Sequence, residues 1–286
     1  MKLNKIILCS ISIFSISHIY AEDEICKSYI GQEVSGNSFD FYYQKAKALN
    51  FRPKNEFEST SAYKQFLDSN ITRLNLPKYI IVEIPIDRKE IRFDADNWVI
   101  NIGEYSMNNA NTAYGDTFLY KYSPSYSSEF DQIEISREVK PIGNYVAATA
   151  FGGKVLVNRQ QTIYKSIFDK PKEEPSTYSI TQLDKSLKSI NVSHDDIGLN
   201  YAKSFKQNSK AYAVISLKPP YAITVNNEES EATLNDRVAD TIVNKVLFAD
   251  IKCLVMVDQN KKTVYSQDVT THQNTINTDD SLKLKN

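Results

Sequence analysis

The stretch YVAATAFGGKVLVN, residues 145–158, places two adjacent glycines between two runs of residues that favour β-strands. Glycine is scarce in this chain, with 8 in 286 residues, which is less than half of the average usage of about 7%. Because glycine accepts the positive φ angles that tight hairpin turns require, a Gly-Gly pair in this position is a strong hairpin signal. We therefore expect strands over residues 145–150 and 154–158, joined through Phe151-Gly152-Gly153.

Alternation of apolar and polar residues predicts further strands on both sides of this hairpin. The apolar residues shift from odd-numbered to even-numbered positions at Asp96-Asn97, and from even-numbered to odd-numbered positions near Ala249-Asp250. Each shift requires a turn or a bulge. A polar turn at residues 258–261 leads into the last strand. The predicted strands cover residues 80–86, 91–95, 98–102, 117–122, 130–135, 211–217, 222–225, 238–257 and 263–266.

Apolar residues at three- and four-residue spacing predict short amphipathic helices. The clearest helix follows the candidate cap Ser38 and carries apolar residues at Phe39, Tyr42, Ala46 and Leu49. Others are expected around residues 63–67, 183–190 and 197–205. Together with the strands, these helices predict an α+β fold with mainly antiparallel sheets and several short amphipathic helices.

One internal segment has the composition of a linker. FDKPKEEPST, residues 168–177, is charged, contains two prolines and lacks apolar periodicity. The predicted organisation is a signal peptide at residues 1–21, an N-terminal helical segment at 22–76, a β-rich first half at 77–167, the linker at 168–177, an α+β second half at 178–268 and a disordered tail at 269–286.

The N-terminus has the layout of a secretory signal peptide. Lys2 and Lys5 precede an apolar stretch over residues 6–16, and the small residue Ala21 stands before an acidic start. The alternative is an uncleaved anchor, but the apolar stretch is short for a membrane span. We expect a periplasmic or secreted bacterial protein with no transmembrane span after the leader is removed.

The charge balance predicts no nucleic-acid partner. Removing residues 1–21 takes away two lysines and no acid, so 34 basic residues become 32 against 35 acidic ones, a formal charge of −3. Nucleic-acid binding instead needs a basic surface to contact phosphates.

Two cysteines remain after the predicted cleavage, Cys26 near the start and Cys253 near the end. In an oxidising compartment such a pair favours a disulfide. Closing so long a loop contributes on the order of 4–5 kcal/mol in the chain-entropy model. The alternative is a buried Cys253 in a strand and a Cys26 in a loose terminus.

Residues suited to catalysis or metal binding are few. Only His194 and His272 follow the leader, and the motifs of zinc hydrolases, serine hydrolases, thiol oxidoreductases and phosphate loops are missing from the sequence. His194 precedes two acids, but we interpret Ser193 and Asp196 as a capping box for the following helix rather than as neighbours of a metal site. We expect neither a metal nor a cofactor.

An aromatic run forms the most suggestive binding patch. Phe118, Tyr120 and Tyr122 alternate along one predicted strand and share a face, where rings with polar tips can stack on sugars or form a partner interface. The alternative is the ordinary preference of strands for aromatic residues, in a chain that contains 18 tyrosines.

Two functions of different classes are consistent with these features. The first is a non-catalytic envelope interaction module that binds an envelope protein or a glycan through a strand face or edge. The second is a hydrolase of cell-wall glycan that uses a pair of carboxyl groups, because two such acids can lie far apart in sequence and leave no motif.

Overall fold

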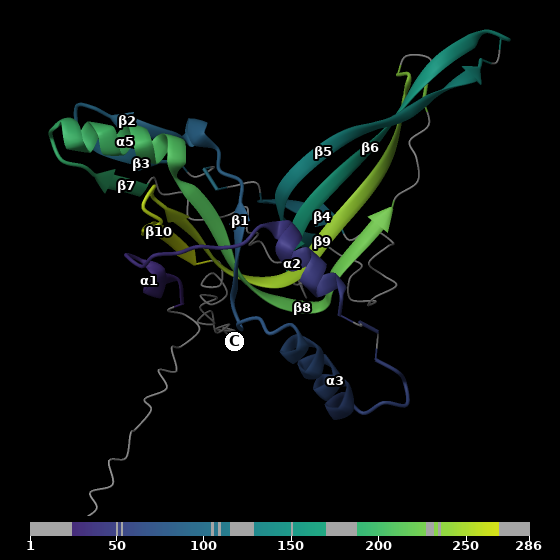
Figure 1. Cartoon of the computed structure of the whole chain (residues 1–286), viewed down its shortest axis with the longest axis horizontal. Coiled ribbons are helices and arrows are strands. Elements are labelled where there is room, and N and C mark those ends of the chain that lie inside the picture. The colour runs from purple at the N-terminus through teal and green to yellow at the C-terminus, as the bar shows by residue number, and fades with distance from the viewer. Residues whose placement is uncertain are drawn as a thin grey trace, which may run out of the picture.

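The computed structural model describes residues 25–49, 51–52, 54–103, 106–107, 110–114, 129–149, 151–169, 188–226, 232–233 and 236–268. A seven-stranded sheet forms the body, and a three-stranded sheet with one helix lies toward one end of the long axis (Figure 1). The elements are α1 (Ile25–Tyr29), α2 (Phe39–Lys47), α3 (Thr60–Arg73), β1 (Ile80–Ile84), η2 (Arg88–Glu90), β2 (Ile91–Asp94), β3 (Val99–Ile102), β4 (Ala110–Tyr114), β5 (Glu129–Ala148), β6 (Lys154–Phe168), β7 (Lys188–Asn191), α5 (Asp196–Asn208), β8 (Lys210–Asn226), β9 (Val238–Val257) and β10 (Thr263–Asp268).

Strand β9 lies at the centre of the large sheet. Its first half pairs with β6 on one edge and with β8 on the other, and its second half pairs with β8 and β10. The second half of β9 is mostly apolar, and residues 253–257 are all buried. Such a run is typical of a strand covered on both faces.

The α+β class is confirmed, but the prediction of mainly antiparallel sheets is wrong for the large sheet, which is mixed. β6 and β9 run parallel from Asn158–Val238 to Phe168–Phe248. Parallel neighbours need a long crossover, and here the chain passes through β7, α5 and β8 between the two strands. Strands from the predicted first half (β1, β4, β5, β6) and second half (β8, β9, β10) therefore form one sheet.

The predicted bulge in β9 is present, slightly displaced from its expected position. The pairs Val214–Cys253 and Ile215–Ile251 leave Lys252 as the extra residue, two positions beyond Asp250. A second irregularity lies in β8 between Leu217 and Ala222, where the chain passes through Pro219-Pro220. The two predicted strands over 211–217 and 222–225 are thus one strand with an interruption.

Helix α2 confirms the clearest helix prediction and packs against the large sheet. Ser38 is its N-cap, and its Oγ accepts a hydrogen bond from the Phe41 amide at 3.3 Å. Tyr43 is fully buried, and its hydroxyl donates to the Ile223 carbonyl of β8 at 3.0 Å. The amphipathic pattern thus identifies the buried face of α2.

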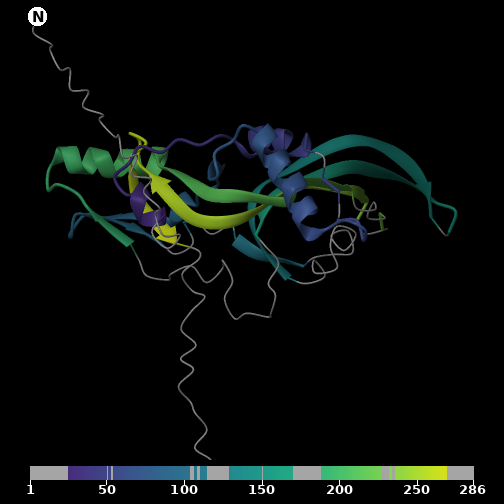
Figure 2. The same ribbon diagram turned by 90° about the horizontal axis from the view of Figure 1, so that it is seen from below.

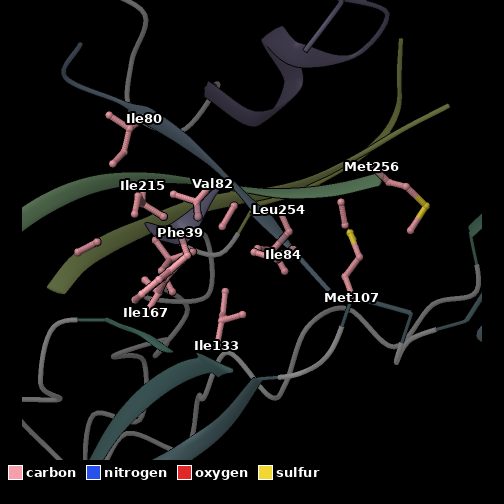
Figure 3. Close-up of a cluster of buried hydrophobic side chains, with 14 of the residues drawn as sticks. Phe39, Ile80, Val82, Ile84, Met107, Ile133, Ile167, Ile215, Leu254 and Met256 are labelled. Carbon is pink, nitrogen blue, oxygen red and sulfur yellow. The ribbon is translucent and has the colours of Figure 1, made fainter. Parts of the chain in front are cut away.

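The main core lies where α2, β1 and the large sheet meet. Alternate residues of β1 point into it, namely Ile80, Val82 and Ile84. Figure 3 shows these side chains beside Phe39 of α2 and Ile133 and Ile167 at the base of β5 and β6. The base of the β5–β6 hairpin is therefore part of the core.

The three-stranded sheet β2-β3-β7 packs with α5. The predicted helix over 183–190 is wrong in its last part, because residues 188–191 form β7 and Ile190 pairs with Ile100 of β3. A strand edge that needs a partner outweighs a weak helical pattern here. The Arg88 guanidinium donates to the carbonyls of Lys206 and Ser209 at 2.8 and 3.0 Å, and so caps the C-terminal end of α5.

The polar turn predicted at residues 258–261 is confirmed and is organised by one carboxylate. Asp258 Oδ1 accepts from the amides of Asn260 and Lys262 at 2.8 and 3.0 Å, while Oδ2 accepts from the Tyr201 hydroxyl at 3.2 Å. This acid holds the β9–β10 turn and fixes α5 to it.

Several sequence predictions fall outside the described residues. These are the leader at 1–21, the strand at 117–122, most of the linker at 168–177 and the tail at 269–286. Phe168 ends β6, and the Asp169 carboxylate accepts from the Ile251 amide at 3.3 Å. In the described part of the chain, the helices are too short or too polar to cross a membrane.

The first prediction concerns alkaline pH. Burial raises the pKa of Tyr201 and of Tyr221 to about 12, helped in Tyr201 by the Asp258 charge, from the ordinary value of 10.0. Because the folded-state pKa is raised, the stabilisation is complete below pH 10 and is lost as pH rises toward about 12. We expect the urea midpoint to fall in this window and to fall less in a Tyr201→Phe, Tyr221→Phe variant.

The matched control is Tyr145→Phe, since this side chain is already exposed in the folded protein. It should leave the alkaline fall unchanged. Equal falls in the wild type and the double variant would contradict the assignment to Tyr201 and Tyr221.

Candidate interaction surface

The aromatic patch predicted at Phe118, Tyr120 and Tyr122 lies outside the described residues. It stays a prediction. The structure exposes a different group of apolar side chains, in the β5–β6 hairpin around Gly152-Gly153.

The predicted hairpin is confirmed and is longer than its sequence signal. β5 and β6 pair in antiparallel register from Gln132–Phe168 to Ala148–Lys154. Beyond Asn158, where pairing with β9 begins, the four pairs from Tyr145–Val157 to Ala148–Lys154 continue without a third strand in the described structure. At about 3.3 Å per residue, they project by roughly 13 Å. Figures 1 and 2 both show this projection.

We call residues 139–158 the arm. Ten large apolar side chains are exposed in the described residues, and the arm carries six of them. These six are Val139, Ile142, Tyr145, Val146, Phe151 and Leu156. The other four are Ile30, Phe41, Phe57 and Ile197. Apolar side chains scattered singly on a surface are ordinary, whereas a group on one projection marks an interaction site.

The register explains how the apolar residues are displayed. Val146 lies directly opposite Leu156, with 62% and 51% of their surfaces exposed. The neighbouring pair Tyr145–Val157 faces the other side, because successive residues of a strand alternate. Val157 is buried while Tyr145 is half exposed. One face of the arm is thus fully open, and the other is partly covered.

The turn at the end of the arm is internally hydrogen-bonded. The Thr149 amide donates to the Gly153 carbonyl at 2.7 Å, the Gly152 amide to the Thr149 carbonyl at 2.9 Å, and the Gly153 amide to Thr149 Oγ1 at 2.9 Å. Gly152 has φ +80°, which explains why glycine is required there. Phe151 stands at the apex with 94% of its surface exposed.

The arm carries a net positive charge. It contains Lys140 and Lys154 and no acid, and Arg159 and Lys165 follow it on β6. With a net charge of −1 for the whole chain, the +2 of the arm leaves −3 for the rest. Two of these bases pair with acids near the base of the arm, Lys140 with Glu138 at 3.1 Å and Lys165 with Asp40 at 2.6 Å.

Contacts at its base hold the arm in the sheet. Asp240 of β9 accepts from Thr162 Oγ1 at 2.7 Å and from Gln160 Nε2 at 3.2 Å. The Arg137 guanidinium lies over the Tyr164 ring at 5.5 Å from its centroid. Since these residues flank the projecting part, the arm leaves the body in a fixed direction.

The histidine and acids near the small sheet have local structural partners. The His194 ring stacks on Trp98, with centroids 5.1 Å apart. The predicted capping box at Ser193 and Asp196 is wrong in detail, because the N-cap of α5 is Asp195, which accepts from the Gly198 amide at 2.9 Å and from Ser193 Oγ at 2.6 Å. In the described residues, no three His, Cys, Asp or Glu side chains are arranged to hold a metal ion.

The carboxyl groups with clearly shifted pKa values in the described chain are shifted downward. A hydrogen bond from Arg52 lowers the pKa of Glu58, one from the Asn97 side chain lowers that of Asp94, and one from Ser193 lowers that of Asp195. Each hydrogen bond favours the charged form. These three acids serve turns, caps and an ion pair.

Cys26 and Cys253 lie in the same buried cluster as free thiols. Cys26 is on α1, and its Sγ donates to the carbonyl of Lys252, the residue before Cys253, at 3.4 Å. Folding therefore brings α1 and the second half of β9 together at these cysteines. The predicted disulfide between them stays a prediction.

Comparison with known proteins gives no relative from which a site could be transferred. No family model matches the chain, and neither a curated protein nor a solved structure is significantly similar to it.

The cysteine pair gives the second prediction. In protein from which residues 1–21 have been removed, we expect no titratable thiol after denaturation without reductant and two after reduction, because Cys26 and Cys253 share one cluster. Denatured, unreduced protein with two reactive thiols would contradict the bond. A Cys26→Ser variant should show one thiol under both conditions.

Proposed function

We propose that this protein is a periplasmic or secreted interaction module, without a catalytic role, that binds a component of the cell envelope through its arm. The observation that carries the proposal is the gathering of exposed apolar side chains on a basic projection. The signal-peptide layout of residues 1–21 supports the location.

The energetics favour a covered arm. Burying one large apolar side chain contributes about 1.5–3 kcal/mol, so Phe151, Val146 and Leu156 together offer a partner a substantial gain. In the described protein these three side chains are exposed to water rather than buried against other residues. A partner surface that covers these side chains removes their apolar area from water, which stabilises the complex.

The geometry of the arm also favours binding. Because its base is fixed by the core residues Ile133 and Ile167 and by the contacts of Asp240, little conformational entropy is lost when the tip is covered. Preorganisation of this kind strengthens binding without adding contacts.

The three carboxyl groups with a clearly lowered pKa do not fit the acid of a glycan hydrolase. A hydrolase of the carboxylate type needs one acid whose pKa is raised, so that it stays protonated until it protonates the leaving group. Glu58, Asp94 and Asp195 are shifted in the opposite direction.

The third prediction tests the arm as the contact surface. The variant Val146→Thr, Phe151→Ser, Leu156→Thr removes its apolar side chains, and threonine has the β-branching that strands favour. We expect the bound fraction in co-sedimentation with isolated cell envelopes to fall by about tenfold or more. The melting temperature should barely change, because these side chains are exposed.

The control variant is Phe57→Ser, Ile197→Thr, which removes apolar side chains that are 89% and 76% exposed but lie off the arm. It should sediment with envelopes as the wild type does. Equal losses in both variants, or wild-type binding by the arm variant, would contradict the proposed function.

A further inference from the structure

We infer that the arm binds an anionic lipid surface, with the turn around Phe151 entering the headgroup region. This inference rests on the proposed function, that the arm is the contact surface, and names its partner. It selects a lipid surface over the envelope protein or glycan expected from the sequence.

The distribution of apolar side chains fits a soft, flat surface. The most exposed large apolar residue of the described chain, Phe151, is at the apex. Val146 and Leu156 follow behind it as one cross-strand pair, and Tyr145 presents an aromatic ring with a polar tip. An apolar tip with an aromatic residue behind it matches the change from hydrocarbon to water across a membrane interface.

The charges match an anionic surface. Lys154 is exposed directly after the turn, and Lys140 and Arg159 lie farther back. The acids that face this region are on the body side: Glu138 pairs with Lys140, Asp240 accepts from Thr162, and Asp236 lies on the loop before β9. With +2 in the arm and −3 elsewhere in the chain, an anionic surface attracts the arm and repels the body. This asymmetry orients the molecule arm first.

The hydrogen bonding of the arm limits how deep it enters. In the described structure, β5 beyond Ile133 pairs only with β6, and β6 before Asn158 pairs only with β5. The outer edges of these segments therefore need water. Unpaired backbone groups are strongly unfavourable in hydrocarbon. The turn differs, because the amides of Thr149, Gly152 and Gly153 all donate within it. Only the turn and Phe151 therefore leave water, and the strands stay at headgroup level.

The fourth prediction is co-sedimentation of the protein without residues 1–21 with two kinds of vesicle, phosphatidylcholine alone and an equal mixture with phosphatidylglycerol. We expect binding to the mixed vesicles only, weakened by added salt because exposed charges are screened. Phe151→Ser should weaken it by about tenfold or more. Lys154→Glu should weaken it by about tenfold, through the reversed charge. The off-arm control Phe57→Ser should bind as the wild type does.

A spectroscopic measurement locates the tip. In a Phe151→Trp variant, brominated lipid should quench the added tryptophan, measured against the wild type, whose single Trp98 lies in the small sheet. Vesicle binding without this quenching would overturn the insertion of the turn.

The two proposals fail separately. Loss of envelope binding in the triple arm variant, combined with no wild-type binding to anionic vesicles, would overturn the lipid partner and keep the arm as a protein or glycan contact. Self-association of the wild type that is abolished by Phe151→Ser, without vesicle binding, would instead assign the tip to a second copy of this chain. Unchanged envelope binding by the triple variant would overturn both proposals.

Discussion

The fold depends on satisfying the backbone of one long buried strand. β9 spans 20 residues, and every amide and carbonyl in its buried part needs a partner because water is excluded. β8 supplies partners along one edge, and β6 and β10 divide the other between them. Both halves of the chain must therefore contribute strands to a single sheet, whatever the composition of the segment between them.

The arm follows from unequal strand lengths. β5 and β6 pair with each other well beyond the point where β9 begins at Val238, so the hairpin continues after its neighbour has ended. Beyond that point the hairpin is a two-stranded ribbon, and no other element covers both of its faces in the described structure. The same antiparallel pairing that is buried at Ile133 and Ile167 thus displays Val146 and Leu156 at its other end.

Local patterns predicted local structure well and long-range pairing poorly. The Gly152-Gly153 turn, the α2 face and the Asp258 turn depend on nearby residues, so the sequence indicated each of them. The sequence predicts two short strands over residues 130–135 and 145–150, but both belong to β5, in which a bulge accommodates Pro141 and Gly143. The exposure of the arm could not be predicted, because a strand with apolar residues on both faces resembles a buried one until its neighbours are known.

The parallel ladder between β6 and β9 gives the arm a mechanical property. A load pulling lengthwise on the arm tip passes into β6, whose bonds to β9 run from Asn158 to Phe168 across the load. In this shear geometry the bonds must break together, whereas a load that peeled the hairpin sideways would break them singly. The joint therefore resists a load along the arm more strongly than a load across it.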